Sequence, residues 1–151
     1  MRIVVCKSAR TLWVWRHGEC LLRTRIFLGR AADAGPKSRE GDGRTPEGDY
    51  YICTKNARSR YHLSLGISYP GPKDAAGGAV SPDALETIRD AWAQGLRPPW
   101  DTPLGGYIML HGAHPQGKTG DWTEGCVALS DPEMDRLFQL AEIGTPVTIL
   151  P

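Results

Sequence analysis

One cysteine of this 151-residue chain stands in a setting that suits a nucleophile. Cys126 directly follows Gly125, and His111 lies fifteen positions upstream, at the end of the apolar run 107–110. A thiol attacks a carbonyl group only as a thiolate, and a neighbouring imidazole is a common means of generating one. We therefore expect Cys126 to be a nucleophile and His111 to be its general base. A cysteine and a histidine are a weak signal by themselves, so the surrounding motifs matter.

Gly125 leads to a second expectation, which concerns the backbone beside the sulfur. Because glycine has no side chain, we expect the backbone beside the sulfur to be uncrowded, so that a substrate carbonyl can approach. Main-chain N–H groups of Gly125 and Cys126 would then be donors for the oxyanion that forms during attack.

Three ordered motifs resemble those of the YkuD-type L,D-transpeptidase family. His111-Gly112, followed by residues 123–127 (Thr-Glu-Gly-Cys-Val), is similar to the family's His-Gly and Ser/Thr-x-Gly-Cys-Ile/Val signature. Residues 45–52 (Thr-Pro-Glu-Gly-Asp-Tyr-Tyr-Ile) resemble its Thr-Pro-x-Gly-x-Tyr/Phe-x-Ile element. Residues 62–70 resemble the branch typified by murein L,D-transpeptidase-like proteins, which carries Gly-Cys-x-Ala. The matches run from about residue 37 to the C-terminus.

The resemblance implies a mainly β fold: a single L,D-transpeptidase-type domain over residues 1–151, sandwich-like or barrel-like, with two or three short helices. It also implies a transferase that acts on peptidoglycan stem peptides in cell-wall synthesis and cell shape. Cys126 would form a thioester acyl-enzyme that an amine of a second stem resolves. His111 would act as base and acid, with its ring oriented by the carbonyl of Gly112. No cofactor or metal is required, and carbapenem-type β-lactams are expected to acylate Cys126.

One position departs from the family pattern. Many members carry arginine two positions after the cysteine, where this chain has Ala128. We expect Lys37, Arg39 or Arg44 of the loop 29–44 to replace that charge, and of these Lys37 and Arg44 are the expected substrate contacts. The resemblance implies four further substrate contacts, and for His62 and Trp122 a purely structural role stays open. These four candidates are His62, Trp122, Thr123 and Glu124.

Two other functions remain open at this point. Water in place of the amine acceptor would make the protein an L,D-carboxypeptidase or an amidase-type hydrolase on the same substrates, and Ala128 favours this alternative. A non-catalytic peptidoglycan-binding module has no use for a thiol, so it would keep its affinity after Cys126→Ala. Zinc binding by His111, His114 and Cys126 is disfavoured, because no fourth ligand stands at a recognisable spacing.

Composition limits the possible partners. The formal net charge is +1, which gives no reason to expect nucleic acid as a partner, and no run of about 18 apolar residues predicts a membrane span. Residues 1–7 lack the features of a secretory signal. The resemblance implies the cell envelope or periplasm, so the route of export stays open. We expect a monomer. The remaining cysteines, Cys6, Cys20 and Cys53, are expected to be buried free thiols.

The elements that must position these residues follow from periodicity. Alternating apolar residues and short apolar runs predict seven strands, and apolar residues at helical spacing predict two helices. Ser81 and Ser130 are expected to begin the helices, the second with a capping box, and Gly95 and Gly144 to end them. Residues 45–48 are expected to form a tight turn. The predicted strands cover residues 2–6, 11–16, 22–28, 50–54, 61–68, 107–111 and 146–150.

Overall fold

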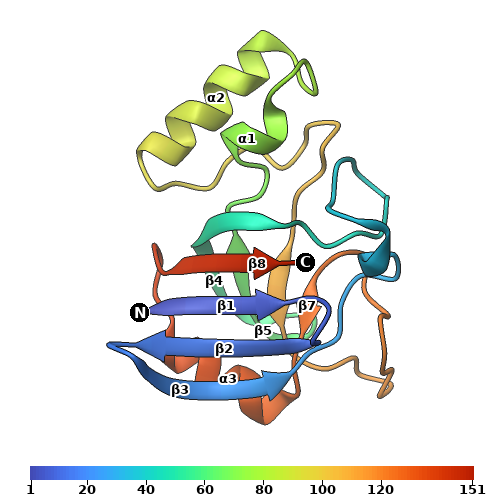
Figure 1. Cartoon of the computed structure of the whole chain (residues 1–151), viewed down its shortest axis with the longest axis vertical. Coiled ribbons are helices and arrows are strands. Elements are labelled where there is room, and N and C mark those ends of the chain that lie inside the picture. Colours follow the sequence, from blue (N-terminus) through green and yellow to red (C-terminus); the bar gives the residue numbers. More distant parts are fainter.

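A single curled sheet of eight strands forms the centre of the protein (Figure 1). The computed structural model describes all residues from 1 to 151. The strands follow one another across the sheet in the order β3-β2-β1-β8-β4-β5-β6-β7. Their bounds are β1 Arg2–Cys6, β2 Thr11–Arg16, β3 Glu19–Arg25, β4 Gly48–Ser59, β5 His62–Ile67, β6 Met109–His111, β7 Val127–Ala128 and β8 Pro146–Leu150.

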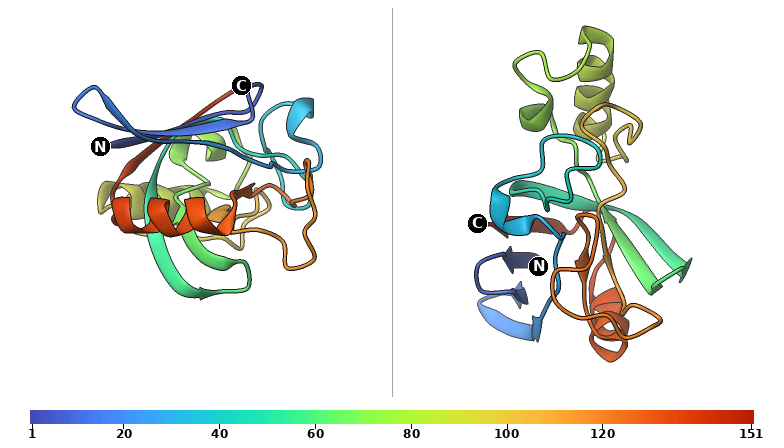
Figure 2. Two further views of the ribbon diagram at one scale, coloured as in Figure 1. Left: turned by 90° about the horizontal axis from the view of Figure 1, so that it is seen from below. Right: turned by 90° about the vertical axis from the view of Figure 1, so that its right-hand side faces the viewer.

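The long strand β4 joins the two halves of the sheet. Its first residues pair with β8, and the rest of the strand pairs with β5 in a hairpin that projects from the body of the molecule (Figure 2). The outer edges also meet, because Phe27, just after β3, exchanges two backbone hydrogen bonds of 2.9 and 2.8 Å with Ala128 of β7. The sheet therefore curls towards a barrel, and the expected mainly β fold is confirmed.

The core lies inside this curl. In β1 and β2, alternate residues are fully buried, as their apolar pattern predicts: Ile3 and Val5, then Leu12 and Val14. Helix α3 (Asp131–Leu140) buries Met134 and packs against β5. Together these elements hold the strands that end at His111 and begin after Cys126 in fixed positions.

Two helices lie together at one end of the molecule, beyond β4 (Figure 1). They are α1 (Pro72–Ala75) and α2 (Pro82–Ala93). As expected, Ser81 caps α2 by accepting a hydrogen bond from the backbone of Ala84, and Gly95 follows its end with φ of +68°. The ring of Trp92 packs on Tyr51 of β4 at 5.0 Å between centroids. None of the helices is long and apolar enough to cross a membrane.

Several expected elements differ in detail. The two-residue strand β7, helix α1 and the 3-10 turn Ala32–Ala34 were not predicted, because each is too short to show a period. Residues 45–47 lead into β4 without the expected tight turn, although Gly48 has φ of +131°. Helix α3 ends at Leu140, four residues before Gly144, and Ser130 precedes it without a side-chain cap.

The cysteines outside the site are free thiols, as expected, but they are less buried than expected. Cys6 and Cys53 are half-buried and Cys20 is exposed, because each lies on a strand at a position that faces outwards or towards the edge.

Candidate active site

A cavity of about 320 Å³ brings Cys126 and His111 together. It lies where the tip of the β4–β5 hairpin meets the loop that joins β6 to β7. These two segments are distant in the sequence, and the antiparallel pairing of β5 with β6 makes them neighbours. The residues that line the cavity are Arg60, Tyr61, His111, His114, Lys118, Trp122, Thr123, Glu124 and Cys126.

His111 is the last residue of β6 and is almost fully buried. Its Nδ1 lies 2.8 Å from the carbonyl oxygen of Gly112, which is the contact that the family resemblance implies. A carbonyl oxygen only accepts hydrogen bonds, so Nδ1 carries the proton and Nε2 of the neutral ring holds the lone pair. Burial lowers the pKa of His111, although the Gly112 carbonyl acts in the opposite direction. The ring is therefore neutral near pH 7 and able to accept a proton.

Cys126 is half-buried and directly precedes β7. Its thiol donates to the carbonyl of Tyr107 and accepts from the backbone N–H of Met109, both at 3.4 Å, and no hydrogen bond joins it to His111. Burial raises the pKa of the thiol to about 11, against the opposing effects of the Met109 N–H and the charge of Lys37. The sulfur is therefore protonated at neutral pH. Contacts between a nucleophile and its base often tighten only once substrate binds.

Thr123 organises the loop before the cysteine. Its hydroxyl donates to the carbonyl of Cys126 at 2.7 Å and accepts from the N–H of Gly125 at 3.1 Å. The N–H of Gly125 is therefore occupied within the loop. The backbone N–H of Cys126 has no acceptor in the protein, and it is the donor left free beside the sulfur.

The expectation that Gly125 leaves open space beside the sulfur is wrong. Gly125 is buried with φ of +138°, and a Cβ atom there would lie 2.7 Å from the carbonyl oxygen of Arg44 and 3.0 Å from Ile108. Glycine is needed at this position because the loop 29–44 packs directly onto it.

The two loop cations expected to contact substrate lie outside the cavity lining. Lys37 and Asp42 form an ion pair of 3.0 Å, and both side chains are only 4% exposed. Burial opposes ionisation of Asp42, but donors from Lys37 and from three backbone N–H groups outweigh it and lower the pKa of Asp42 to about 2. Arg44 instead contributes its backbone, which bonds Asp42 and packs on Gly125.

The other sequence candidates divide between cavity and surface. Trp122 lines the cavity, with its ring 5.3 Å from that of Tyr61 and 4.9 Å from that of His114. Glu124 also lines it and pairs with Arg30 at 3.1 Å. His62 does not line the cavity, because it turns towards α3 and binds Asp135 at 2.5 Å.

Three lining residues were missed by sequence reasoning: Arg60, Tyr61 and Lys118. Tyr61 stands immediately before a motif residue, and that adjacency was the only available signal. Ala128, which departs from the family pattern described above, is fully buried in β7 and faces no solvent. No group of three or more His, Cys, Asp or Glu side chains is arranged to hold a metal ion.

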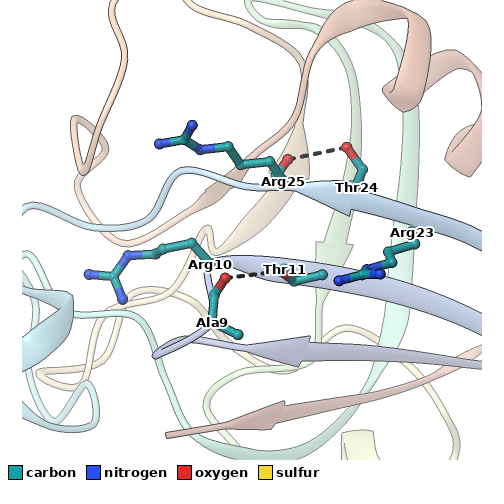
Figure 3. Close-up of a pocket in the computed structure, with 6 residues that line it drawn as sticks. All are labelled: Ala9, Arg10, Thr11, Arg23, Thr24 and Arg25. Carbon is teal, nitrogen blue, oxygen red and sulfur yellow. Dashed lines mark hydrogen bonds between the residues drawn. The ribbon is translucent and has the colours of Figure 1, made fainter.

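A second hollow, of about 480 Å³, lies along β2 and β3 and is drawn in Figure 3. Its threonine hydroxyls are occupied, since Thr11 donates to the carbonyl of Ala9 and Thr24 to that of Arg25. Arg10, at one end, forms ion pairs with Asp121 and Asp33. This hollow contains no nucleophile, and its link to the site is structural: Asp121 belongs to the loop that leads to Cys126.

Comparison with known proteins identifies relatives of this chain. YafK of Escherichia coli, which carries a provisional L,D-transpeptidase name, is 27% identical over 143 residues, covering 91% of this chain and 45% of YafK. The cell-shape-determining protein Pgp2 of Campylobacter jejuni has a similar structure (TM-score 0.65, 21% identity, 98% of this chain and 46% of that one). So has LdtMt1, an LD transpeptidase solved with imipenem (TM-score 0.56, 16% identity, 99% and 58%).

The chain thus spans slightly less than half the length of YafK and of Pgp2. At these identities the two solved structures establish the likeness of fold. The model of the YkuD family, described as the L,D-transpeptidase catalytic domain, matches residues 1–149. A match over nearly the whole chain means that this protein belongs to the YkuD family of L,D-transpeptidase catalytic domains.

Proposed function

We propose that this protein is a cysteine-dependent L,D-transpeptidase that acts on peptidoglycan stem peptides. The observation that carries the proposal is the shared cavity of Cys126 and His111, in which the Gly112 carbonyl fixes the imidazole so that Nε2 holds its lone pair. This is the arrangement that a general base needs when it must take a proton from a thiol.

The reaction runs in two steps. As Cys126 Sγ attacks the carbonyl carbon of the L-configured centre of a diamino acid, its proton passes to Nε2 of His111. The backbone N–H of Cys126 stabilises the oxyanion. The intermediate then collapses to a thioester, and His111 returns the proton to the nitrogen of the departing D-amino acid.

In the second step an amine from another stem attacks the thioester. His111 takes a proton from the amine, the new amide bond forms, and the cysteine leaves as a thiol after the proton returns to sulfur. The protonated thiol and neutral imidazole of the free site suit this cycle, because the proton moves only once a carbonyl is in place. Residues around the cavity, including Trp122, Thr123 and Glu124, would contact the stem.

Purified muropeptides test the proposal. Wild-type protein, Cys126→Ala and His111→Ala are incubated with tetrapeptide stems, with and without an added D-amino acid, and the products are identified by mass spectrometry. We expect exchanged or cross-linked stems with the wild type alone, and a carbapenem adduct on Cys126. Release of the terminal residue without exchange would identify an L,D-carboxypeptidase. Stem binding without any product or adduct, retained in Cys126→Ala, would identify a binding module.

A further inference from the structure

We propose that Arg60 and Lys118 form the anion-recognition site of the cysteine cavity and bind a stem-peptide carboxylate beside the scissile bond. This inference rests on the proposed function and identifies the chemical group that the site selects. Arg60 comes from the tip of the β4–β5 hairpin and Lys118 from the loop after β6, so the two cations enter the cavity from different elements.

Both cations are available to a ligand. Neither lies within ion-pair distance of a carboxylate, whereas the cations of the loop and of the β1–β2 turn, Lys37 and Arg10, are neutralised by aspartates. Glu124 is the only acidic residue in the lining, and it faces Arg30 at 3.1 Å. The cavity therefore presents two uncompensated positive charges, which attract an anionic group.

Arg60 is also held in place. Its guanidinium carbon lies 5.5 Å from the ring centroid of Tyr61, which itself stacks on His111. An arginine over an aromatic face keeps its donors at the edge of the ring, where they can bind a carboxylate in a bidentate manner. The charges of Arg60 and Lys118 both act on His114, where they add to burial in lowering the pKa of that residue.

The position two residues after the cysteine carries no charge. Ala128 is enclosed within β7, so the chain has no cation where the family pattern has arginine. The expected replacements, Lys37 and Arg44, do not line the cavity. Arg60 and Lys118 supply the charge from the hairpin tip and from the loop after β6.

Binding measurements separate this inference from the proposed function. Isothermal titration on the Cys126→Ala protein uses three tetrapeptide stems: one with free carboxylates, one amidated at the terminal D-residue and one amidated on the diamino-acid side chain. We expect one amidated stem to bind at least about tenfold more weakly, because a charge-assisted contact is lost. The stem that weakens identifies which carboxylate is bound.

Variants in the same background complete the test. Arg60→Gln and Lys118→Gln should each reduce the discrimination between free and amidated stems to within about threefold. Arg60→Lys should retain part of it. Arg58→Gln, an exposed arginine of the same hairpin outside the cavity, is the matched control and should change nothing. Equal affinity for all three stems, or full discrimination in both glutamine variants, overturns the inference. Failure of the wild type to process stems overturns the proposed function separately.

Discussion

The ring of Tyr61 stacks on the imidazole of His111, with centroids 4.5 Å apart and planes 22° from parallel. The backbone carbonyl of Tyr61 also accepts the N–H of Gly112 at 2.8 Å, and Gly112 in turn accepts from Nδ1 of His111. Tyr61, at the tip of a hairpin, thus contacts one face of the His111 ring and also holds the Gly112 peptide that orients this ring. Tyr61 is therefore a positioning residue for the proposed base.

Replacing the ring should reduce turnover without abolishing it. An aromatic pair contributes about 0.5–1.5 kcal/mol beyond buried area. For Tyr61→Leu we expect kcat to fall roughly twofold to tenfold, since about 1.4 kcal/mol corresponds to a factor of ten in rate. Tyr61→Phe keeps the stack and should keep the rate. The acidic limb of the pH profile should move upwards in Tyr61→Leu only, because the imidazole becomes more hydrated. An unchanged profile would assign Tyr61 a purely structural role.

The pH dependence of kcat/KM should have its acidic limb below pH 6.5. The base must be neutral, which requires a pH above the pKa of His111, and burial lowers that pKa below the usual histidine value of 6.5. Activity therefore persists to lower pH than an exposed histidine would allow. The measurement is kcat/KM on a stem peptide from pH 4.5 to 8. An acidic limb above pH 7 would contradict the lowered pKa of the buried ring.

Alkylation of Cys126 should increase steadily with pH. With a thiol pKa of about 11, the thiolate fraction keeps growing through pH 9 and 10. Brief iodoacetamide treatment followed by peptide mapping measures the rate at Cys126, with the exposed Cys20 as an internal comparison. A plateau already reached near pH 7 would indicate a thiolate–imidazolium pair in the free enzyme, and the mechanism would then begin from that pair.

The sequence predicted the parts of the fold that have a clear period. β1 and β2 alternate buried and outward residues, and α2 carries both a capping serine and a terminal glycine, so local chemistry specifies them. The two-residue strand β7 is defined only by its pairing with β6 and with Phe27, which are long-range contacts. No local pattern can specify such a strand.

Site residues that belong to a sequence motif could be predicted. Residues that reach the site only through long-range contacts of the fold could not. Cys126, His111 and Gly112 lie as their motifs indicate. Arg60 and Lys118 reach the cavity only because a hairpin and a loop converge there. The reason for Gly125 was also hidden, since the atom that excludes a side chain belongs to Arg44, far away in the sequence.

Breaking the buried ion pair of the loop 29–44 should destabilise the protein. Asp42→Asn leaves Lys37 charged and 4% exposed, and removing one partner of a buried pair costs about 3–5 kcal/mol. Urea unfolding measures this loss, and Asp101→Asn, at an exposed aspartate without an ion pair, should have little effect.

The same pair predicts the acid dependence of stability. The pKa of Asp42 is about 2 in the folded protein, below its ordinary value of 3.8, so its contribution is present above pH 3.8 and is lost as the pH falls through 2. The difference in unfolding free energy between wild type and Asp42→Asn should therefore shrink over that window. A difference that stays constant between pH 5 and 2 would mean that the carboxylate is not the stabilising group.

The ion pair between Arg10 and Asp121 should control the order of the loop that leads to Cys126. Arg10 donates from Nε at 3.1 Å and from Nη2 at 2.7 Å to the two carboxylate oxygens of Asp121, and so ties this loop to the β1–β2 turn. Because both side chains are about a quarter exposed, Asp121→Asn should cost only roughly 1 kcal/mol of stability. Hydrogen exchange at residues 122–126 should nevertheless accelerate, and kcat should fall severalfold as the cysteine loses its fixed position.

Asp33→Asn is the matched control: Asp33 pairs with the same arginine at 2.9 Å, but its side chain is 81% exposed and lies in another loop. Equal effects of the two substitutions on hydrogen exchange and kcat would contradict this prediction. They would mean that the ion pair with Asp121 does not specifically order the loop that leads to Cys126.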